Sequence, residues 1–195
     1  LKEEVHGNKV LSGSGQTLYP MMSAADVVSS ERRCGMSFDR VKQWLETRGY
    51  GERAVAFDVS SATVPLAALA LGVEEARIAK TLSFKDADGG ALIVVAAGDA
   101  RVDNPRFKAA FSTKARMLTP DEALSLTGFA VGGVCPFDLK EGAKLYLDES
   151  LKRFDTVYPA CGSANSAVRL SPQELENLTG GIWVSVCKVP EAPVD

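Results

Sequence analysis

The stretch TLSFKDADGGALIVVAAG, residues 81–98, decides the fold. Two apolar runs rich in β-forming side chains, TLSF (81–84) and ALIVVAAG (91–98), flank the polar link DADGG (86–90). A short polar link that ends in two glycines is typical of a turn between paired strands. The stretch therefore predicts a β-hairpin, and the rest of the domain is expected to be built around it.

Short helical signals alternate with extended segments on both sides of this hairpin. A helix is expected over residues 64–71, because Thr63 can cap it, Pro65 suits its first turn and Gly72 ends it. Other helical segments are predicted at residues 74–80, 104–111, 121–127 and 173–179, and from Met36 onward through Phe38, Val41, Trp44 and Leu45. Strands are predicted at residues 114–118, 144–148, 155–160, 166–170 and 182–187. The alternation favours an α+β domain with a mixed, strongly curved sheet.

Length and composition bound the class of protein. The chain has 195 residues, of which 46% are hydrophobic and 24% charged, which suits one globular domain. No apolar run reaches the ~18 residues of a membrane span and no signal peptide is recognisable, so a cytoplasmic location is expected. Residues 1–35 mix glycine, serine and charge without a helical or strand period. We expect them to be a leader or tail outside the fold, with the domain over residues 36–195.

The distribution of histidine and cysteine excludes several chemistries. The single histidine, His6, lies in the predicted leader, so no Ser-His-Asp, Cys-His or HExxH site can be built in the domain. The four cysteines show no paired spacing of a zinc or redox motif. We therefore predict no metal and no cofactor. Any hydrolysis would depend on lysine, carboxylates, hydroxyls, backbone amides or the substrate itself.

The net charge of −3 argues against general nucleic-acid binding, because such binding depends on neutralising phosphates. One basic segment differs from the rest. Residues 101–116 carry Arg101, Arg106, Lys108, Lys114 and Arg116 against the single acid Asp103. This segment is either a solvated helix face or a local contact with phosphate.

Three segments together resemble the YbaK family of aminoacyl-tRNA deacylases, the free-standing relatives of the prolyl-tRNA synthetase editing domain. They are LGVEEARIAKTLSF with AAGDARVDNPRF, then TGFAVGGVCPFDL, then LYLDESLKRFDTVYPACGSANSAVRLSPQEL, in the family's order and spacing. The resemblance implies a compact α+β domain with a barrel-like mixed sheet and short surrounding helices. It also implies hydrolysis of mischarged aminoacyl-tRNA in trans. The expected partners are the acceptor end of aminoacyl-tRNA and an aminoacyl-tRNA synthetase, with no membrane.

Lys80, in AKTL, matches the family's essential lysine and is expected where a helical turn gives way to a strand. Its compact cation suits charge stabilisation at the ester or a hold on the terminal phosphate. The alternative is a lysine that caps a helix C-terminus. The hydroxyl of the adjacent Thr81 is a candidate substrate contact, although a β-branched residue in a strand needs no such role.

Gly132 and Gly133, in AVGGVCPF, match the family's glycine-rich loop. Their backbone can take a positive φ and bring N–H groups close to a ligand oxygen, so they are catalytic candidates for binding the oxyanion. The alternative is a plain turn. Many family members have glycine where this chain has Asp138. Cys135 beside the glycines could be a nucleophile, but without a histidine partner a small buried side chain is the favoured interpretation.

The remaining candidates contact the substrate or the tRNA. Asp148, in YLDES, matches a recurrent family aspartate that could bind the substrate amino group or fix the shape of the pocket, and it could equally be an N-cap. Gly162 and Ser163, in GSANS, suit backbone and ribose contacts. The tRNA-binding candidates are Arg101, Arg106 and Lys108.

The expected mechanism is substrate-assisted ester hydrolysis, because the ester is already activated and a ribose hydroxyl lies beside it. The resemblance suggests small amino acids such as Ala, Ser, Thr or Cys as the group removed. Two alternatives remain open. The first is a non-catalytic module that binds the tRNA acceptor end or a partner protein with the same fold. The second is a hydrolase of small aminoacyl esters or thioesters unrelated to tRNA.

Overall fold

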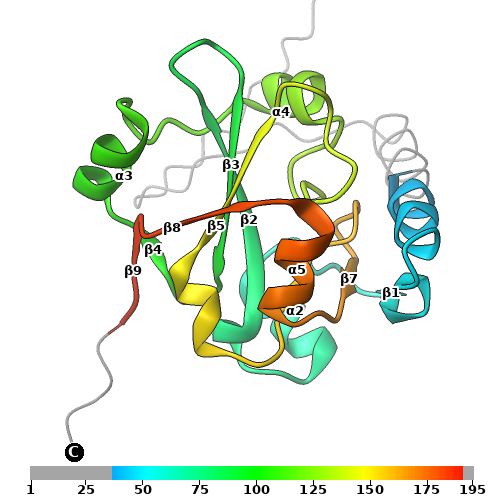
Figure 1. Cartoon of the computed structure of the whole chain (residues 1–195). Coiled ribbons are helices and arrows are strands. Elements are labelled where there is room, and N and C mark those ends of the chain that lie inside the picture. Colours follow the sequence, from blue (N-terminus) through cyan, green and yellow to red (C-terminus); the bar gives the residue numbers. More distant parts are fainter. Residues whose placement is uncertain (1–36, 191–195) are drawn as a thin grey trace, which may run out of the picture.

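The computed structural model describes residues 37–190, and Figure 1 shows their arrangement. Helices lie around a central sheet of mixed strand direction, so the predicted α+β class is confirmed. The predictions about residues 1–35 fall outside the described residues.

The predicted hairpin is present and forms the middle of the main sheet. Strand β2 (Ile78–Lys85) pairs antiparallel with β3 (Ala91–Ala97), so that Lys80 lies opposite Ala96. The five-stranded sheet has the order β6-β2-β3-β5-β8, with β5 at Lys144–Asp148, β6 at Tyr158–Pro159 and β8 at Ile182–Val184. The β2–β6, β3–β5 and β5–β8 pairs are parallel. The sheet is therefore mixed, as predicted.

Two two-stranded ladders lie outside this five-stranded sheet. Strand β1 (Ala54–Ala56) pairs with β7 (Ser166–Val168), and β4 (Arg101–Val102) pairs with β9 (Cys187–Lys188). A single bridge between Ala160 and Ala167 joins the end of β6 to β7. Strand pairing thus continues beyond β6 at one edge of the sheet.

Four eight-residue helices lie where the sequence predicts them, to within one residue, although the Thr63 side chain makes no capping hydrogen bond at the first of them. They are α2 (Val64–Leu71), α3 (Asn104–Phe111), α4 (Pro120–Thr127) and α5 (Pro172–Thr179), each with proline at its first or second position. Capping boxes start α4 and α5, at Thr119 and Ser171, where a hydroxyl and a glutamate satisfy free N–H groups. A further helix covers residues 37–46, in line with the predicted helix near Met36.

Some predicted boundaries differ from the structure. The helical turn expected at residues 74–80 is only the 3-10 turn η2 (Glu75–Arg77), and the next residues already belong to β2, because Ile78 pairs with Tyr158. Residues 114–118 form only one bridge, between Met117 and Phe84. The strand expected at residues 182–187 is divided into β8 and β9, which pair with different neighbours.

The core lies on both faces of the main sheet. Every residue of β3 is buried, which explains why its sequence is continuously apolar and not alternating. Val41 and Leu45 of the helix at residues 37–46 are fully buried on one side. The 3-10 turn η3 (Glu149–Arg153) follows β5 and buries Leu151. Among the described residues, no helix is long and apolar enough to cross a membrane.

Candidate active site

A cavity of about 380 Å³ lies along β2. Its walls come from the start of α2, the segment just before α4, the loop after α4, and strands β6 and β7. Three predicted site residues line it together, namely Lys80, Thr81 and Gly132. Gly133, Asp148, Gly162 and Ser163 are not among its lining residues.

Lys80 is the third residue of β2, and its ammonium is bound by two backbone carbonyls. Its Nζ donates to the oxygen of Gly98 at 2.9 Å and to the oxygen of Ala100. Both carbonyls belong to the turn between β3 and β4, so Lys80 does not cap a helix. Burial lowers the pKa of Lys80 below its usual 10.5, and a neighbouring Asp99 partly opposes this shift. An ammonium has three N–H groups, so one remains for a ligand.

The Thr81 hydroxyl is the one buried side-chain oxygen without a hydrogen-bond partner among residues 37–190. An unsatisfied buried hydroxyl costs free energy of roughly 1–3 kcal/mol, so native structures keep few of them without a reason. Because Thr81 lines the cavity beside Lys80, a polar group of a ligand could supply the missing partner.

The glycine pair forms a tight turn whose two members have different roles. The N–H of Gly133 donates to the oxygen of Ala130 at 3.0 Å, which closes a four-residue turn with Val131 and Gly132 at its centre. Gly132 has φ +90°, the value that a type II turn requires at this position. The amide of Gly133 is therefore engaged inside the turn, whereas the turn's own hydrogen bond does not use the Gly132 N–H.

Gly133 instead allows two loops to touch. A Cβ atom at this position would lie 2.9 Å from the oxygen of Gly162 and 3.1 Å from the Cα of Ser163. Gly162 is itself confined, because its Cβ would lie 2.6 Å from the oxygen of Ser37. Ser163 Oγ lies 2.7 Å from Ser166 Oγ, and Ser166 lines the cavity. Gly162 and Ser163 thus do not line the cavity themselves, but Ser163 contacts the lining residue Ser166 and helps to hold it in place.

Asp148 ends β5 and is 1% exposed. One carboxylate oxygen accepts from the N–H of Ser150 at 3.0 Å, and the other accepts from the N–H groups of Val186 and Cys187 at 2.9 and 3.0 Å. These contacts include the N-cap interaction that the sequence allowed. They join η3 to the start of β9, so the geometry favours a role in fixing shape over a contact with the substrate amine.

Cys135 is fully buried and lines none of the cavities described here. Burial raises the pKa of its thiol far above its usual range, and no thiolate forms at neutral pH under such conditions. The structure agrees with a small buried side chain at this position.

The three predicted tRNA-binding residues are all exposed, but they differ in their hydrogen bonds within the protein. Arg101 is exposed and lines a second cavity, of about 790 Å³, which also contains Lys80 and Lys188. Arg101 and Lys188 are directly opposite in the β4–β9 ladder. Lys108 is exposed on α3, whereas Arg106 donates to the oxygen of Cys187 at 3.1 Å. Arg101 and Lys108 are thus freer than Arg106 to contact phosphate.

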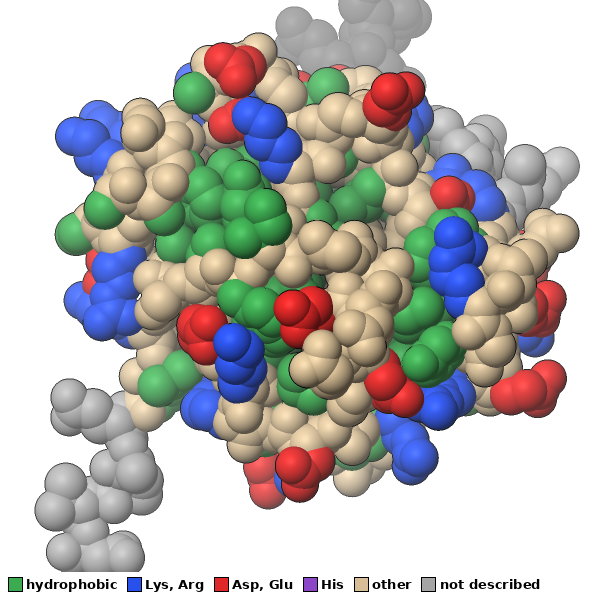
Figure 2. Space-filling model, in the orientation of Figure 1, with side chains coloured by type: hydrophobic (Ala, Val, Ile, Leu, Met, Phe, Trp, Pro, Cys, Tyr) green, Lys and Arg blue, Asp and Glu red, His purple; other side chains and the backbone are tan. Residues whose placement is uncertain are grey.

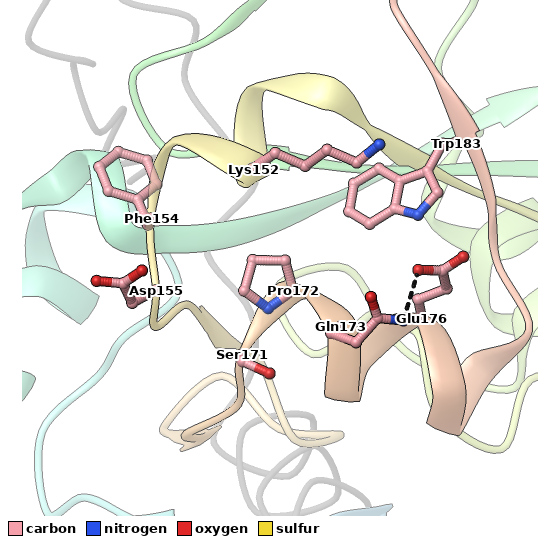
Figure 3. A pocket seen from close by; sticks show the side chains of 8 residues that line it. All are labelled: Lys152, Phe154, Asp155, Ser171, Pro172, Gln173, Glu176 and Trp183. Atoms are coloured by element: carbon pink, nitrogen blue, oxygen red, sulfur yellow. Dashed lines mark hydrogen bonds between the residues drawn. The ribbon is translucent and has the colours of Figure 1, made fainter.

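A third hollow lies away from the predicted site residues. It is formed between η3, the start of α5 and β8 (Figure 3), where the Lys152 ammonium lies 4.2 Å from the centre of the Trp183 ring. On the face drawn in Figure 2, acidic and basic side chains are intermixed without a field of one sign. Neither feature indicates a broad nucleic-acid surface on that face.

Sequence reasoning missed part of the cavity wall. Ser61 and Thr63 before α2, Met117, Val131 and Tyr158 all line it, but they come from four separate segments. Residue type alone singles out none of them, because only the tertiary fold brings them to β2. The hydrophobic pattern of their segments does not show that Met117 and Val131 are exposed.

Comparison with known proteins identifies the family. The family model of the aminoacyl-tRNA editing domain matches residues 59–178. The chain belongs to this family. The matched range contains β2, the glycine turn and the whole cavity wall, so the editing domain coincides with the site described above.

Two curated proteins and two solved structures are similar to this editing domain. Protein YwhH of Bacillus subtilis is 52% identical over 133 residues, 68% of this chain and 85% of the relative. EbsC of Enterococcus faecalis, a candidate Cys-tRNA(Pro)/Cys-tRNA(Cys) deacylase, is 26% identical over 70% of this chain and 84% of its own. The crystal structure of a candidate trans-editing enzyme for prolyl tRNA synthetase superposes with a TM-score of 0.71 at 35% identity, and covers 78% of this chain and 97% of its own. Hypothetical protein APE2540 gives a TM-score of 0.69 at 34% identity, with 76% and 99% covered.

These comparisons establish the family-level activity. Editing domains act on aminoacyl-tRNA, and deacylation of it is the activity with which the family is associated.

Proposed function

We propose that the protein is a trans-editing hydrolase that removes a small amino acid from the 3′ ribose of a mischarged tRNA. The observation that carries the proposal is the cavity along β2, which brings Lys80, Thr81 and Gly132 together inside an aminoacyl-tRNA editing domain. A synthetase that mischarges the tRNA is the natural partner, since such an enzyme would supply the substrate.

The walls of the cavity support a small, uncharged amino acid side chain. The lining side chains are mainly small, apolar or hydroxyl-bearing, and Lys80 is the only charged one among the described residues. A site built this way accepts a methyl, hydroxymethyl or thiol group without leaving a buried charge unpaired. This chemistry agrees with the Ala, Ser, Thr or Cys expected from the sequence.

The proposed reaction needs little from protein side chains. Water attacks the ester carbonyl carbon, the bond from that carbon to the ribose oxygen breaks, and the ribose oxygen takes up the proton that the water loses. The vicinal ribose hydroxyl positions the water and relays this proton. The N–H of Gly132 binds the oxyanion as charge develops, and the Thr81 hydroxyl binds a polar group of the substrate. The Gly133 amide, engaged with Ala130, is assigned no chemical step.

Lys80 supplies the positive charge of the proposed site. Its two hydrogen bonds to Gly98 and Ala100 fix the position of the ammonium, and one N–H remains for a ligand oxygen. A cation that is fixed before the substrate arrives stabilises developing negative charge without reorganising. The same geometry also suits a hold on the terminal phosphate from the second cavity, which Lys80 shares.

Two glycines with nearly equal backbone geometry test the role of Gly132. Gly132 has φ +90° and Gly142 has φ +89°, and a Cβ at either position meets no atom closer than 3.5 Å. Replacing either by alanine should cost a similar strain of about 1–2 kcal/mol. Alanine keeps the Gly132 N–H, so the variant acts through its methyl group, which would lie 3.6 Å from Ala62 Cβ at the cavity wall and hinder the approach of the ester oxygen. We expect Gly132→Ala to lower kcat for deacylation of alanyl- or cysteinyl-tRNA by about 10²-fold, and Gly142→Ala to leave kcat unchanged. Equal kcat in both variants would refute a close approach of the ester to Gly132, on which the oxyanion role depends.

A non-catalytic module is the second candidate, and one observation favours it. Lys80 is already bound by two carbonyls and Asp148 by three N–H groups, so less of the expected machinery is free than the sequence indicated. A screen of charged tRNAs decides between the two. Hydrolysis that depends on the tRNA body supports the editing enzyme, binding without hydrolysis supports the module, and equal hydrolysis of free aminoacyl esters supports a small-ester hydrolase.

A further inference from the structure

Two exposed apolar side chains stand at the wall of the cavity along β2. Met117 is 52% exposed and Val131 is 62% exposed, and both line the cavity. Exposed apolar side chains that are scattered singly over a surface need no explanation, whereas those grouped around a cavity often mark a binding site.

The backbones of both residues are fixed, so the two side chains are held in place. The segment of Met117 is tied to β2 on both sides, because Arg116 O accepts from the N–H of Lys85 at 2.8 Å and the N–H of Leu118 donates to Ser83 O at 3.0 Å. Val131 occupies the outer corner of the type II turn that the Gly133 N–H closes. An apolar side chain on a fixed backbone can contact a ligand without the entropic cost of ordering that backbone.

The position of Val131 indicates which part of a substrate it meets. It precedes Gly132, the proposed partner of the ester oxygen, so the group beside it is attached close to the ester. In an aminoacyl-tRNA two groups flank the ester, the amino acid and the terminal ribose with its base. The inner cavity is assigned to the amino acid, so the exposed rim at Val131 is left for the ribose and its base. Met117 follows the exposed Arg116, a cation of the sign that attracts phosphates. The apolar pair is thus continuous with the proposed ester site and bordered by charge of the sign that a polynucleotide needs.

We propose that Met117 and Val131 form a subsite for the nucleobase of the tRNA's terminal nucleotide, which rests on the function proposed above. The two faces of a base are apolar and polarisable, and stacking on them tolerates any sequence. The flexible thioether of Met117 adapts to the ring of the base, while the rigid side chain of Val131 limits how deeply that ring enters the subsite. The subsite recognises the presence of a base, and the inner cavity selects the amino acid.

The test compares two non-hydrolysable probes that differ only in the base. One is 3′-alanylamido-3′-deoxyadenosine 5′-phosphate, and the other is the same alanylamido ribose phosphate without the base. Calorimetry on the full chain should show about tenfold tighter binding of the first probe, equal to about 1.4 kcal/mol. In the double variant Met117→Ser with Val131→Ser this preference should fall to about twofold or less.

Ile182→Ser is the matched control, because Ile182 is 63% exposed on β8 and does not line the cavity. This variant should keep the full preference. The proposal is overturned if the wild-type protein binds both probes equally, or if the double variant keeps the preference while circular dichroism shows it folded. The more conservative pair Met117→Leu with Val131→Ile should retain the preference, which separates loss of the apolar contact from loss of fold. Binding of the probes needs no turnover, so a protein that binds them as expected but hydrolyses no aminoacyl-tRNA would refute the hydrolase and leave the subsite in place.

Discussion

Replacing Lys80 by alanine removes the positive charge of the proposed site and two hydrogen bonds at once. The ammonium holds the carbonyls of Gly98 and Ala100, and hydrogen bonds to charged groups are worth about 1.5–3 kcal/mol each. Because Gly98 lines a cavity that water can enter, we expect water to replace part of this bonding and the free energy of unfolding to fall by about 1–3 kcal/mol. Loss of one preorganised charge donor should lower kcat/KM by about 10²–10³, or roughly 2.7–4 kcal/mol.

The assay measures single-turnover deacylation of one responsive aminoacyl-tRNA, with urea unfolding and circular dichroism on the same samples. Lys80→Arg should also be impaired, because a planar guanidinium cannot occupy the position of a compact ammonium between two carbonyls. Lys80→Met keeps the length of the stem and isolates the charge. A folded Lys80→Ala protein with kcat/KM near that of the wild type would refute the reasoning, and a dead Cys135→Ala protein beside it would point to a thiol nucleophile.

Because the pKa of Lys80 is lowered, we expect a rise in pH to change activity and stability in opposite directions. Burial disfavours the ammonium, so Lys80 loses its proton at a lower pH in the folded protein than in the unfolded chain, where the pKa is 10.5. The part of the activity that depends on Lys80 should therefore fall as pH rises through the lowered pKa. Between that value and 10.5 the unfolded chain binds more protons, so stability should rise with pH relative to Lys80→Met. Parallel changes in rate and stability would contradict the assignment.

Three further changes test the periphery of the site. Truncation to Met36 should leave the melting temperature and the deacylation rate unchanged, and a drop in either would show that residues 1–35 contribute to the domain. Arg101→Ala with Lys108→Ala should raise KM more than it lowers kcat, and should reduce the slope of log affinity against log salt by about one per lost phosphate contact; an unchanged tRNA affinity would leave both as solvated side chains. Cys135→Ala should keep most of the activity, and the native Cys135 thiol should resist alkylation until the protein unfolds, as mass spectrometry can show.

Local signals predicted most of the elements because they are encoded within a few residues. Gly72, Gly128 and Gly180 end three helices at the expected positions, each with a positive φ. The hairpin was predictable for the same reason, since its turn and both strands are contiguous. The division of residues 182–187 between two ladders was not, because it depends on Asp148 binding Val186 and Cys187 from 38 and 39 residues away.

The candidate site was predictable only where a family motif carries it. Lys80, Thr81 and Gly132 do line one cavity. The engagement of Gly133 with Ala130, of Lys80 with two carbonyls and of Asp148 with three N–H groups could not be predicted, because residue type alone does not tell whether a polar group is already satisfied. For the same reason Met117 and Val131 were missed, since exposure is a property of the folded chain.

The contact between Gly133 and the Gly162–Ser163 segment limits how this protein can change under selection. At most packed positions, a larger residue on one side can be accommodated by a smaller one opposite. Here both facing positions are already glycine, so neither can shrink further, and a Cβ on Gly133 would lie 2.9 Å from a backbone oxygen. New amino acid preferences must therefore arise on the other walls of the cavity, at the start of α2 or in the segment before α4. A mutagenesis library aimed at new substrates should hold Gly133 and Gly162 constant and diversify those walls.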